Sequence, residues 1–255
     1  MAERNDYIAV FDSGVGGISV LRRLRQVMPG ERYLYFGDSA NAPYGVRPSA
    51  EVRQLTLAAA EKLLTRGVKA LVIACNTATS AAYEALKERY PHLILTGIEP
   101  ALSVAAERYP GAHVGVMATP TTLRGARFRE NKQRFENVCT ITPLPAPGLM
   151  ELVEAGKYDS PEAEALIRAV LSTCEPAPDV LLLGCTHYPF TEKAIRRVVG
   201  EHTVILDGAL RTAQQTKDAL AQAGLLYDGP GEVIMENSLP QARILQLSRQ
   251  LAGLE

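Results

Sequence analysis

The chain has 255 residues, of which 47% are hydrophobic, and this is enough to bury the core of one large domain or of two modest ones. Its 27 Lys and Arg residues almost balance its 28 Asp and Glu residues, and no long run of one sign occurs, which argues against a nucleic-acid partner and a polybasic membrane patch. No stretch approaches the roughly 20 apolar residues that cross a bilayer, and no secretion signal is recognisable. We therefore expect a cytoplasmic protein with reduced cysteines.

Short apolar segments alternate with longer segments whose apolar residues recur every three or four positions, a pattern typical of βα units and of a mostly parallel sheet. Helical periodicity is clearest over residues 49–65, 78–89, 161–171 and 211–223, and the tail after Leu226 predicts a strand over 232–235 and a helix over 240–251. The Pro-dense residues 143–148 should interrupt regular structure. The expected strands cover residues 8–11, 33–36, 70–74, 94–98, 113–117, 138–142, 180–183 and 204–206.

One motif is repeated within the chain. Residues 72–77 and 182–187 each run from an apolar strand through a small residue to a cysteine, and then to side chains that form hydrogen bonds. The two cysteines, Cys75 and Cys185, are separated by about one domain's length. Two similar lobes that face one another would explain this repeat.

Polar residues follow four of the expected strands, at the edge where ligands bind in open α/β sheets. They are Asp12-Ser13-Gly14, Asp38-Ser39 leading to Pro43-Tyr44-Gly45, Cys75-Asn76-Thr77 and Cys185-Thr186-His187. The glycines of residues 12–17 would let backbone N–H groups approach an anion, yet a plain strand-to-helix turn capped by Asp12 and Ser13 explains them about equally well.

A single cysteine at a strand end is most often a buried structural residue, but two in matching settings favour chemistry. A thiol has a reference pKa of about 8.5, so one cysteine can act as a thiolate base while the other stays a protonated acid. Racemisation needs such a pair, because a proton leaves one face of a carbon and returns on the other. Asp12 would assist Cys75 and His187 would assist Cys185, although a lone His is usually a structural polar residue.

Asn76, Thr77 and Thr186 are neutral donors that could stabilise charge on a substrate carboxylate, or could simply cap helices. Cys139 and Cys174 have no comparable polar neighbours in the sequence, and we assign them to the core or surface. The chain lacks a Cys-x-x-Cys motif, so a structural zinc site and a thioredoxin-like function are both disfavoured. No lysine motif indicates pyridoxal phosphate, and we expect neither a metal nor a cofactor.

Four segments, taken in order, resemble the glutamate racemases of bacterial cell-wall synthesis: residues 12–17, 37–45, 74–79 and 183–189. The resemblance extends over about residues 7–223. It implies two Rossmann-like or flavodoxin-like lobes, residues 1–98 with 208–255 and residues 99–207, with the active site between them. It also implies a pyridoxal-free, two-thiol conversion of L-glutamate to D-glutamate for peptidoglycan, with a small-molecule substrate and a homodimer left open as an assembly.

Carried over motif by motif, the resemblance gives roles to individual residues. Cys75 and Cys185 match the two acid/base groups, Asp12 and His187 match their assistants, and Glu154 matches a third polar group near the site. The substrate-contacting positions correspond to Asp12, Ser13, Tyr44, Gly45, Asn76, Thr77, Thr186 and His187.

Three other functions remain open at this point. An aspartate or other acidic amino-acid racemase would use the same two-thiol chemistry. A single-thiol hydrolase or transferase would need only Cys185 and His187 as nucleophile and base. A non-catalytic anion-binding protein would use the turn of residues 12–17.

Overall fold

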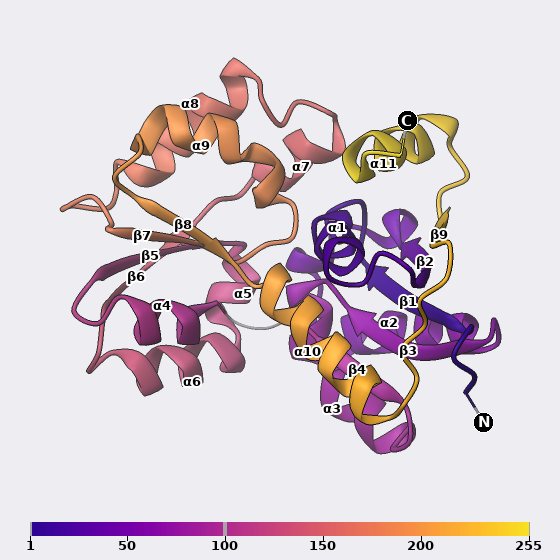
Figure 1. Cartoon of the computed structure of the whole chain (residues 1–255). Helices are drawn as coiled ribbons and strands as arrows, with labels where there is room; N and C mark the ends of the chain where they lie inside the picture. Colours follow the sequence, from indigo (N-terminus) through magenta and orange to yellow (C-terminus); the bar gives the residue numbers. More distant parts are fainter. Residues whose placement is uncertain (1, 99–100, 255) are drawn as a thin grey trace. The chain divides into compact units, whose positions relative to one another are not determined.

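The computed structural model describes residues 2–98 and 101–254 and divides the chain into two compact units (Figure 1). The first unit contains the described residues up to 98 together with residues 209–254, and the second contains residues 101–208. The predicted lobe boundary at residue 99 falls outside the described residues.

The first unit is built on a five-stranded sheet in the order β4-β3-β1-β2-β9, in which every neighbouring pair is parallel. Its strands are β1 (Tyr7–Asp12), β2 (Arg32–Gly37), β3 (Val68–Ile73), β4 (Ile94–Gly97) and β9 (Glu232–Asn237). Its helices are α1 (Ile18–Val27), α2 (Ser49–Leu64), α3 (Asn76–Arg89), α10 (Ala209–Gln222) and α11 (Ala242–Ala252), with short 3₁₀ turns η1 (Ser39–Asn41) and η2 (Tyr44–Val46).

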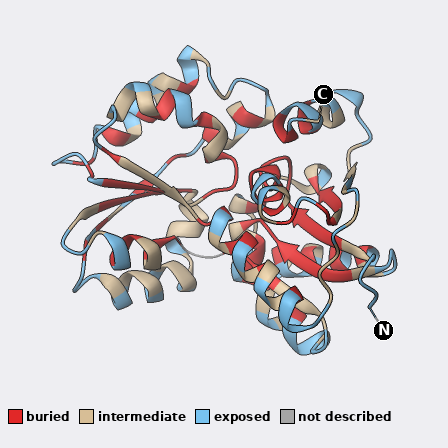
Figure 2. Ribbon diagram, in the orientation of Figure 1, coloured by how far each residue is buried: buried red, intermediate tan, exposed pale blue. Residues whose placement is uncertain are grey.

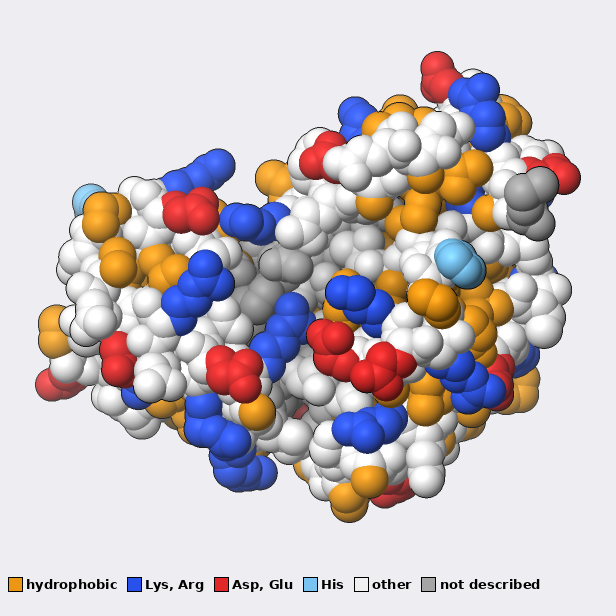
Figure 3. All heavy atoms as spheres, turned by 90° about the horizontal axis from the view of Figure 1, so that it is seen from below, with side chains coloured by type: hydrophobic (Ala, Val, Ile, Leu, Met, Phe, Trp, Pro, Cys, Tyr) orange, Lys and Arg blue, Asp and Glu red, His pale blue; other side chains and the backbone are white. Residues whose placement is uncertain are grey.

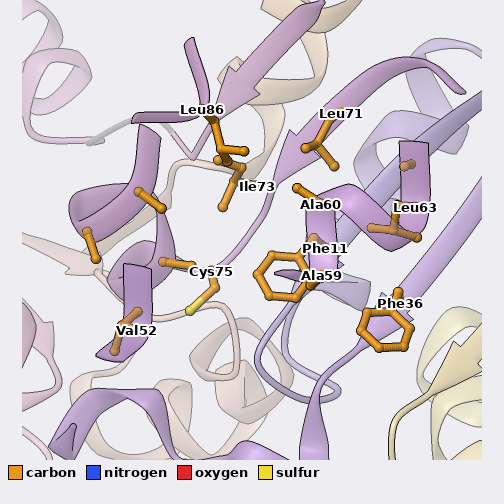
Figure 4. Packing of buried hydrophobic residues seen from close by; sticks show 14 of the residues in the cluster. Phe11, Phe36, Val52, Ala59, Ala60, Leu63, Leu71, Ile73, Cys75 and Leu86 are labelled. Carbon is orange, nitrogen blue, oxygen red and sulfur yellow. The ribbon is translucent and has the colours of Figure 1, made fainter. Parts of the chain in front are cut away.

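The central strands of this sheet are buried on both faces, which is why their sequences are continuously apolar rather than alternating (Figure 2). Successive side chains of a strand point to opposite faces, so Phe11 and Ile73 pack with residues of α2 and α3 (Figure 4). Helices α1 and α10 pack against one another, and α10 also packs against β3 and β4. Cys75 belongs to the Phe11 cluster, so its position is fixed by the core.

The second unit has a four-stranded parallel sheet in the order β6-β5-β7-β8. Its apolar clusters include Leu149, Ile167 and Ile195 with Leu183, and separately Leu102 and Ala105 with Val116. The strands are β5 (His113–Ala118), β6 (Thr140–Pro145), β7 (Val180–Leu183) and β8 (Val204–Asp207). The helices are α4 (Leu102–Arg108), α5 (Pro120–Arg124), α6 (Ala126–Phe135), α7 (Leu149–Glu154), α8 (Pro161–Leu171) and α9 (Glu192–Val199), with a 3₁₀ turn η3 (Tyr188–Thr191).

The two units repeat one topology. The strand order β4-β3-β1-β2 of the first corresponds to β8-β7-β5-β6 of the second, with β9 as an added edge strand. The hydrogen bond that follows the motif strand is also repeated, because Ala74 N–H donates to the Phe11 carbonyl at 2.8 Å and Gly184 N–H donates to the Met117 carbonyl at 2.8 Å. The predicted α/β class with two similar parallel-stranded lobes is confirmed.

The Pro-dense segment does not interrupt regular structure where we expected. Strand β6 continues through Pro143 to Pro145, and it begins at Thr140 rather than Val138. Proline is tolerated there because β6 pairs only with β5 among the described residues and therefore lies at the sheet edge. Within the described residues, no helix combines the length and the apolar character that a membrane span requires.

Candidate active site

Asp12 ends β1 and is completely buried. Its Oδ1 accepts a hydrogen bond from the N–H of Gly14 at 2.9 Å, so the carboxylate caps the turn that follows the strand. Helix α1 begins only after Gly17, whose own Cβ, if present, would lie 2.6 Å from Asp12 Cβ. Glycine at position 17 therefore lets the backbone pass close to the buried Asp12 side chain. Asp12 caps the turn and still lies at the end of β1.

Cys75 lies two residues beyond β3, at the N-cap of α3. Its thiol donates a hydrogen bond to Ser13 Oγ at 3.5 Å, and the residue is 6% exposed. Figure 4 shows it among the apolar side chains of the first unit, beside Phe11 and Val52 in that view. A helix N-terminus stabilises negative charge, so this location favours a thiolate. Asn76 and Thr77 form the first turn of α3, where unpaired backbone N–H groups also collect.

Tyr44 is buried in η2, and its hydroxyl donates to Asp38 Oδ2 at 2.7 Å. Burial, the hydrogen bond to Asp38 and the nearby charges of Cys75 and Asp12 together raise the pKa of Tyr44 far above its ordinary value. The phenol thus stays neutral and shares one electrostatic environment with Asp12 and Cys75.

Asp38 is the polar residue of this unit that our assignment of site residues omitted. It follows β2, is 5% exposed, and accepts hydrogen bonds from Tyr44 and from the amide of Asn41. Its N–H donates to the Asp12 carbonyl at 2.9 Å, so the two carboxylate-bearing residues stand on adjacent strand ends. The position of Asp38 directly after a predicted strand is the sequence feature that indicates it as a site residue.

The second unit gathers Cys185, His187 and Glu154 into a line. Cys185 Sγ lies 3.6 Å from His187 Nδ1, and His187 Nε2 lies 2.8 Å from Glu154 Oε1. Cys185 and His187 belong to the segment that leaves β7 and enters η3, while Glu154 ends α7, which packs against η3. Thr186, which lies between Cys185 and His187 in the sequence, is 6% exposed.

The close packing after β7 depends on a glycine. A Cβ at Gly184 would lie 2.8 Å from Ala118 Cβ and 3.3 Å from the Met117 carbonyl oxygen. The smallest residue is therefore required before Cys185, as Ala74 is the small residue before Cys75.

The imidazole of His187 is 2% exposed, and its surroundings favour the protonated form. Burial lowers its pKa, but the hydrogen bonds to Cys185 and Glu154 and the charges of those two groups outweigh burial and raise the pKa well above 6.5. A protonated imidazole between two acidic groups is able to give a proton to the thiolate or to a reacting atom. The geometry thus permits Cys185 to exchange protons with His187.

Cys139 and Cys174 are both buried, in agreement with their assignment to the core or surface. Cys174 lacks polar neighbours in the sequence, but the fold brings its Sγ to 3.8 Å from His113 Nε2. The same nitrogen is 2.8 Å from Thr142 Oγ1. These residues are 61 and 29 positions apart in sequence, so no local motif could indicate the contact.

The site residues named from the sequence thus fall into two groups that the structure defines separately, one around Cys75 and one around Cys185. Within the described part of the chain, no group of three or more His, Cys, Asp or Glu side chains is arranged to hold a metal ion. The expected absence of a metal or cofactor stays a prediction.

The model of the family described as Asp/Glu/Hydantoin racemase matches residues 17–216. The chain belongs to the Asp/Glu/hydantoin racemase family. It is therefore an isomerase of the racemase type, and the resemblance to glutamate racemases is confirmed by the individual comparisons.

This racemase-family chain is 42% identical over 258 residues to glutamate racemase of Clostridium acetobutylicum, with 100% of each chain covered. It is also similar to two solved structures. One is glutamate racemase of Thermus thermophilus in complex with beta-chloro-D-alanine, with 37% identity, coverage of 99% and 93% of the two chains, and a TM-score of 0.80. The other is glutamate racemase of Francisella tularensis in complex with D-glutamate, with 25% identity, coverage of 99% and 95%, and a TM-score of 0.88.

Proposed function

We propose that this racemase interconverts L-glutamate and D-glutamate, with Cys75 and Cys185 as the two acid/base groups and with no cofactor or metal. The observation that carries the proposal is the repeated strand end, which presents one thiol from each unit of the same topology. Full-length relatives named glutamate racemase supply the choice of substrate.

In the proposed reaction, the thiolate of one cysteine removes the α-proton from one enantiomer. The thiol of the other cysteine then delivers its proton to the opposite face of the same carbon. Each turnover leaves the two cysteines with exchanged protonation states, so the reverse reaction begins from the product arrangement. Both groups have to work, because either one alone would only return the proton to the face it left.

Each thiol has polar neighbours that can exchange or accept its proton. His187, held by Glu154 at 2.8 Å, is placed to give a proton to Cys185 and to take one back. Ser13 accepts from the Cys75 thiol, and the charges of Asp12 and Cys75 both act on Tyr44. We propose that Asp12 and His187 are in this way the assistants of Cys75 and Cys185.

The substrate carboxylate would be bound by neutral donors. The proposed contacts are Asn76 and Thr77 in the first turn of α3, Thr186 beside Cys185, Ser13, and the backbone near Tyr44 and Gly45. Donors fixed by a folded scaffold stabilise the charge that develops on the carboxylate as the α-proton leaves, without reorganising during the reaction. On the face in Figure 3, Lys and Arg side chains are interspersed with Asp and Glu, in line with the near balance of charges in the sequence.

We further propose that the product supplies D-glutamate for peptidoglycan and that the protein acts in the cytoplasm on a small-molecule substrate. Growth of a strain that needs external D-glutamate, after expression of this chain, would support this role. The homodimer also stays a prediction, for which sedimentation analysis of the purified protein is the measurement.

The deciding experiment is proton NMR of L-glutamate incubated with the protein in heavy water, with circular dichroism measured in parallel and with no cofactor added. We expect the α-hydrogen signal to fade while the optical activity decays to zero. If neither changes, the same measurement with L-aspartate follows. Activity with aspartate alone would mean that aspartate, and not glutamate, is the substrate. Activity with neither would contradict the proposed reaction.

A further inference from the structure

Cys185, His187 and Glu154 follow the order nucleophile, base and orienting group. Their two distances, 3.6 Å from Sγ to Nδ1 and 2.8 Å from Nε2 to Oε1, use both ring nitrogens of one imidazole. Thiol and serine hydrolases on unrelated folds use the same arrangement, in which the third group fixes the ring that activates the nucleophile. The same line of three that holds His187 for proton exchange with Cys185 also supports covalent catalysis.

The three side chains are held rigidly in one unit. His187 is 2% exposed, and η3 places its ring between the end of β7 and the end of α7. Tyr188 fixes the same turn, because its hydroxyl donates to the Ala146 carbonyl at 3.0 Å. Cys185 retains 9% exposure, more than its two neighbours Thr186 and His187. The Glu154 side chain is 23% exposed, so the imidazole is the most buried of the three groups.

We propose that Cys185, His187 and Glu154 give this chain a second activity, the hydrolysis of small activated carboxylic esters through a thioester on Cys185. This activity shares Cys185 and His187 with the proposed racemisation but does not need Cys75, since it uses residues of the second unit alone.

The reaction has two steps. In the first, Cys185 sulfur bonds to the acyl carbon, the bond from that carbon to the alcohol oxygen breaks, and His187 donates its proton to the leaving alcohol. In the second, His187 takes a proton from water, the water oxygen bonds to the acyl carbon, and the carbon–sulfur bond breaks. The acid is released, Cys185 and His187 return to their starting protonation, and one water is consumed for each ester.

Cys174 provides a matched comparison within the same unit. Its Sγ also lies near an imidazole, 3.8 Å from His113 Nε2, but that nitrogen contacts Thr142 at 2.8 Å. The other ring nitrogen, Nδ1, is buried and has no hydrogen-bond partner among the described residues. Burial raises the pKa of the Cys174 thiol. A buried thiol without an oriented base should not be acylated, so the second cysteine–histidine pair is a natural control.

The probe is para-nitrophenyl acetate, with nitrophenol release followed in the absence of glutamate and the acetylated peptide located by mass spectrometry. We expect a burst of about one equivalent, acetyl on Cys185, and continued turnover. Cys185→Ser and His187→Asn should each lower the enzyme-dependent rate by at least about 100-fold, and Cys174→Ser should leave it unchanged. Circular dichroism of each variant checks that it is folded.

Glu154 acts through His187 and is therefore a positioning residue, for which a change in rate alone would be ambiguous. Glu154→Gln should move the pH profile of ester turnover to lower pH, because the imidazole loses its charged partner, and Glu154→Asp should restore part of it. An unshifted profile would limit the relay to the thiol and imidazole and overturn the three-residue assignment.

Cys75→Ser separates the two activities. It should abolish racemisation and keep ester turnover, because Cys75 belongs to the other unit. If the wild-type protein shows no racemisation, the proposed function is contradicted but the ester activity is not. The second activity is overturned if nitrophenol release is the same with Cys185→Ser as with the wild-type protein, or if acetyl is found on Cys174 instead.

Discussion

The two units place a thiol at the same point of the same topology and surround it differently. In the first unit Asp12 follows Phe11 at the end of β1, and in the second Ala118 follows Met117 at the end of β5. Two residues beyond the cysteine the difference is reversed, since Thr77 stands where the second unit has His187. The repeated backbone therefore fixes where each sulfur lies, while its polar neighbours come from different elements: Ser13 after β1 for Cys75, and His187 with Glu154 of α7 for Cys185.

The largest expected effect concerns the cysteines themselves. Cys75→Ser and Cys185→Ser should each lower racemisation by about 1,000-fold or more, because a serine hydroxyl is a far weaker acid than a thiol. The loss of optical activity of each enantiomer is the measurement. Cys139→Ser, a buried thiol whose Sγ contacts the Tyr109 carbonyl, is the control that should stay active. Racemisation that survives either active-site change would break the equivalence of the units.

The second prediction concerns a buried ion pair near the start of β3, at the opposite end of that strand from Cys75. Lys69 and Glu31 form a fully buried ion pair in the first unit, with Nζ and Oε2 2.6 Å apart. Lys69→Met should lower the free energy of unfolding by about 3–5 kcal/mol, because it leaves the Glu31 charge buried without its partner. Hydrogen exchange, which reports on each unit separately, should show faster opening of the first unit.

The exposed pair of Arg89 and Glu61 provides the control for this loss, and Arg89→Ala should cost less than about 1 kcal/mol. An equal effect of the two substitutions would mean that burial does not decide the strength of the Lys69 pair.

The third prediction concerns the assistants. Asp12→Asn and His187→Asn should each lower kcat/KM by about 10- to 100-fold. The equilibrium constant between enantiomers is one, so kcat/KM must fall equally in both directions. The asymmetry should instead appear in the deuterium isotope effect, with one variant raising it for α-deuterated L-glutamate and the other for D-glutamate. Both variants raising it for the same enantiomer would contradict the assignment of one assistant to each thiol.

The smallest expected effect is a dependence of stability on pH. The pKa of His187 in the folded protein is raised above 6.5, so the stability that its proton contributes is fully present below about pH 6.5 and is lost as the pH rises through the folded pKa. Urea unfolding of the wild type and of His187→Gln should therefore differ most below about pH 6.5, and the difference should shrink as the pH rises through the folded pKa. A difference that grows with pH would mean that the buried imidazole is neutral.

The eight expected strands before the tail, and the tail strand and helix, are present because buried parallel strands produce apolar runs that alternate with helical periodicity. The predicted extent of β6 was wrong because only the position of this strand in the folded sheet shows that Pro143 and Pro145 lie at the sheet edge. The repeated motif indicated Cys75 and Cys185 from the residues alone. Glu154 came only from the resemblance to a family, since its contact with His187 joins residues 33 positions apart through the packing of α7 on η3.

The outer strands β2 and β6 occupy equivalent positions, and each would offer unpaired backbone groups to another protein chain. In the first unit the C-terminal tail adds β9, which pairs with β2 over its full length. In the second unit Pro143 and Pro145 lack the N–H groups that an additional strand would need. The tail thus covers β2 and makes β9 the edge of the first sheet, whereas in the second unit the prolines remove donors from the edge strand β6 itself.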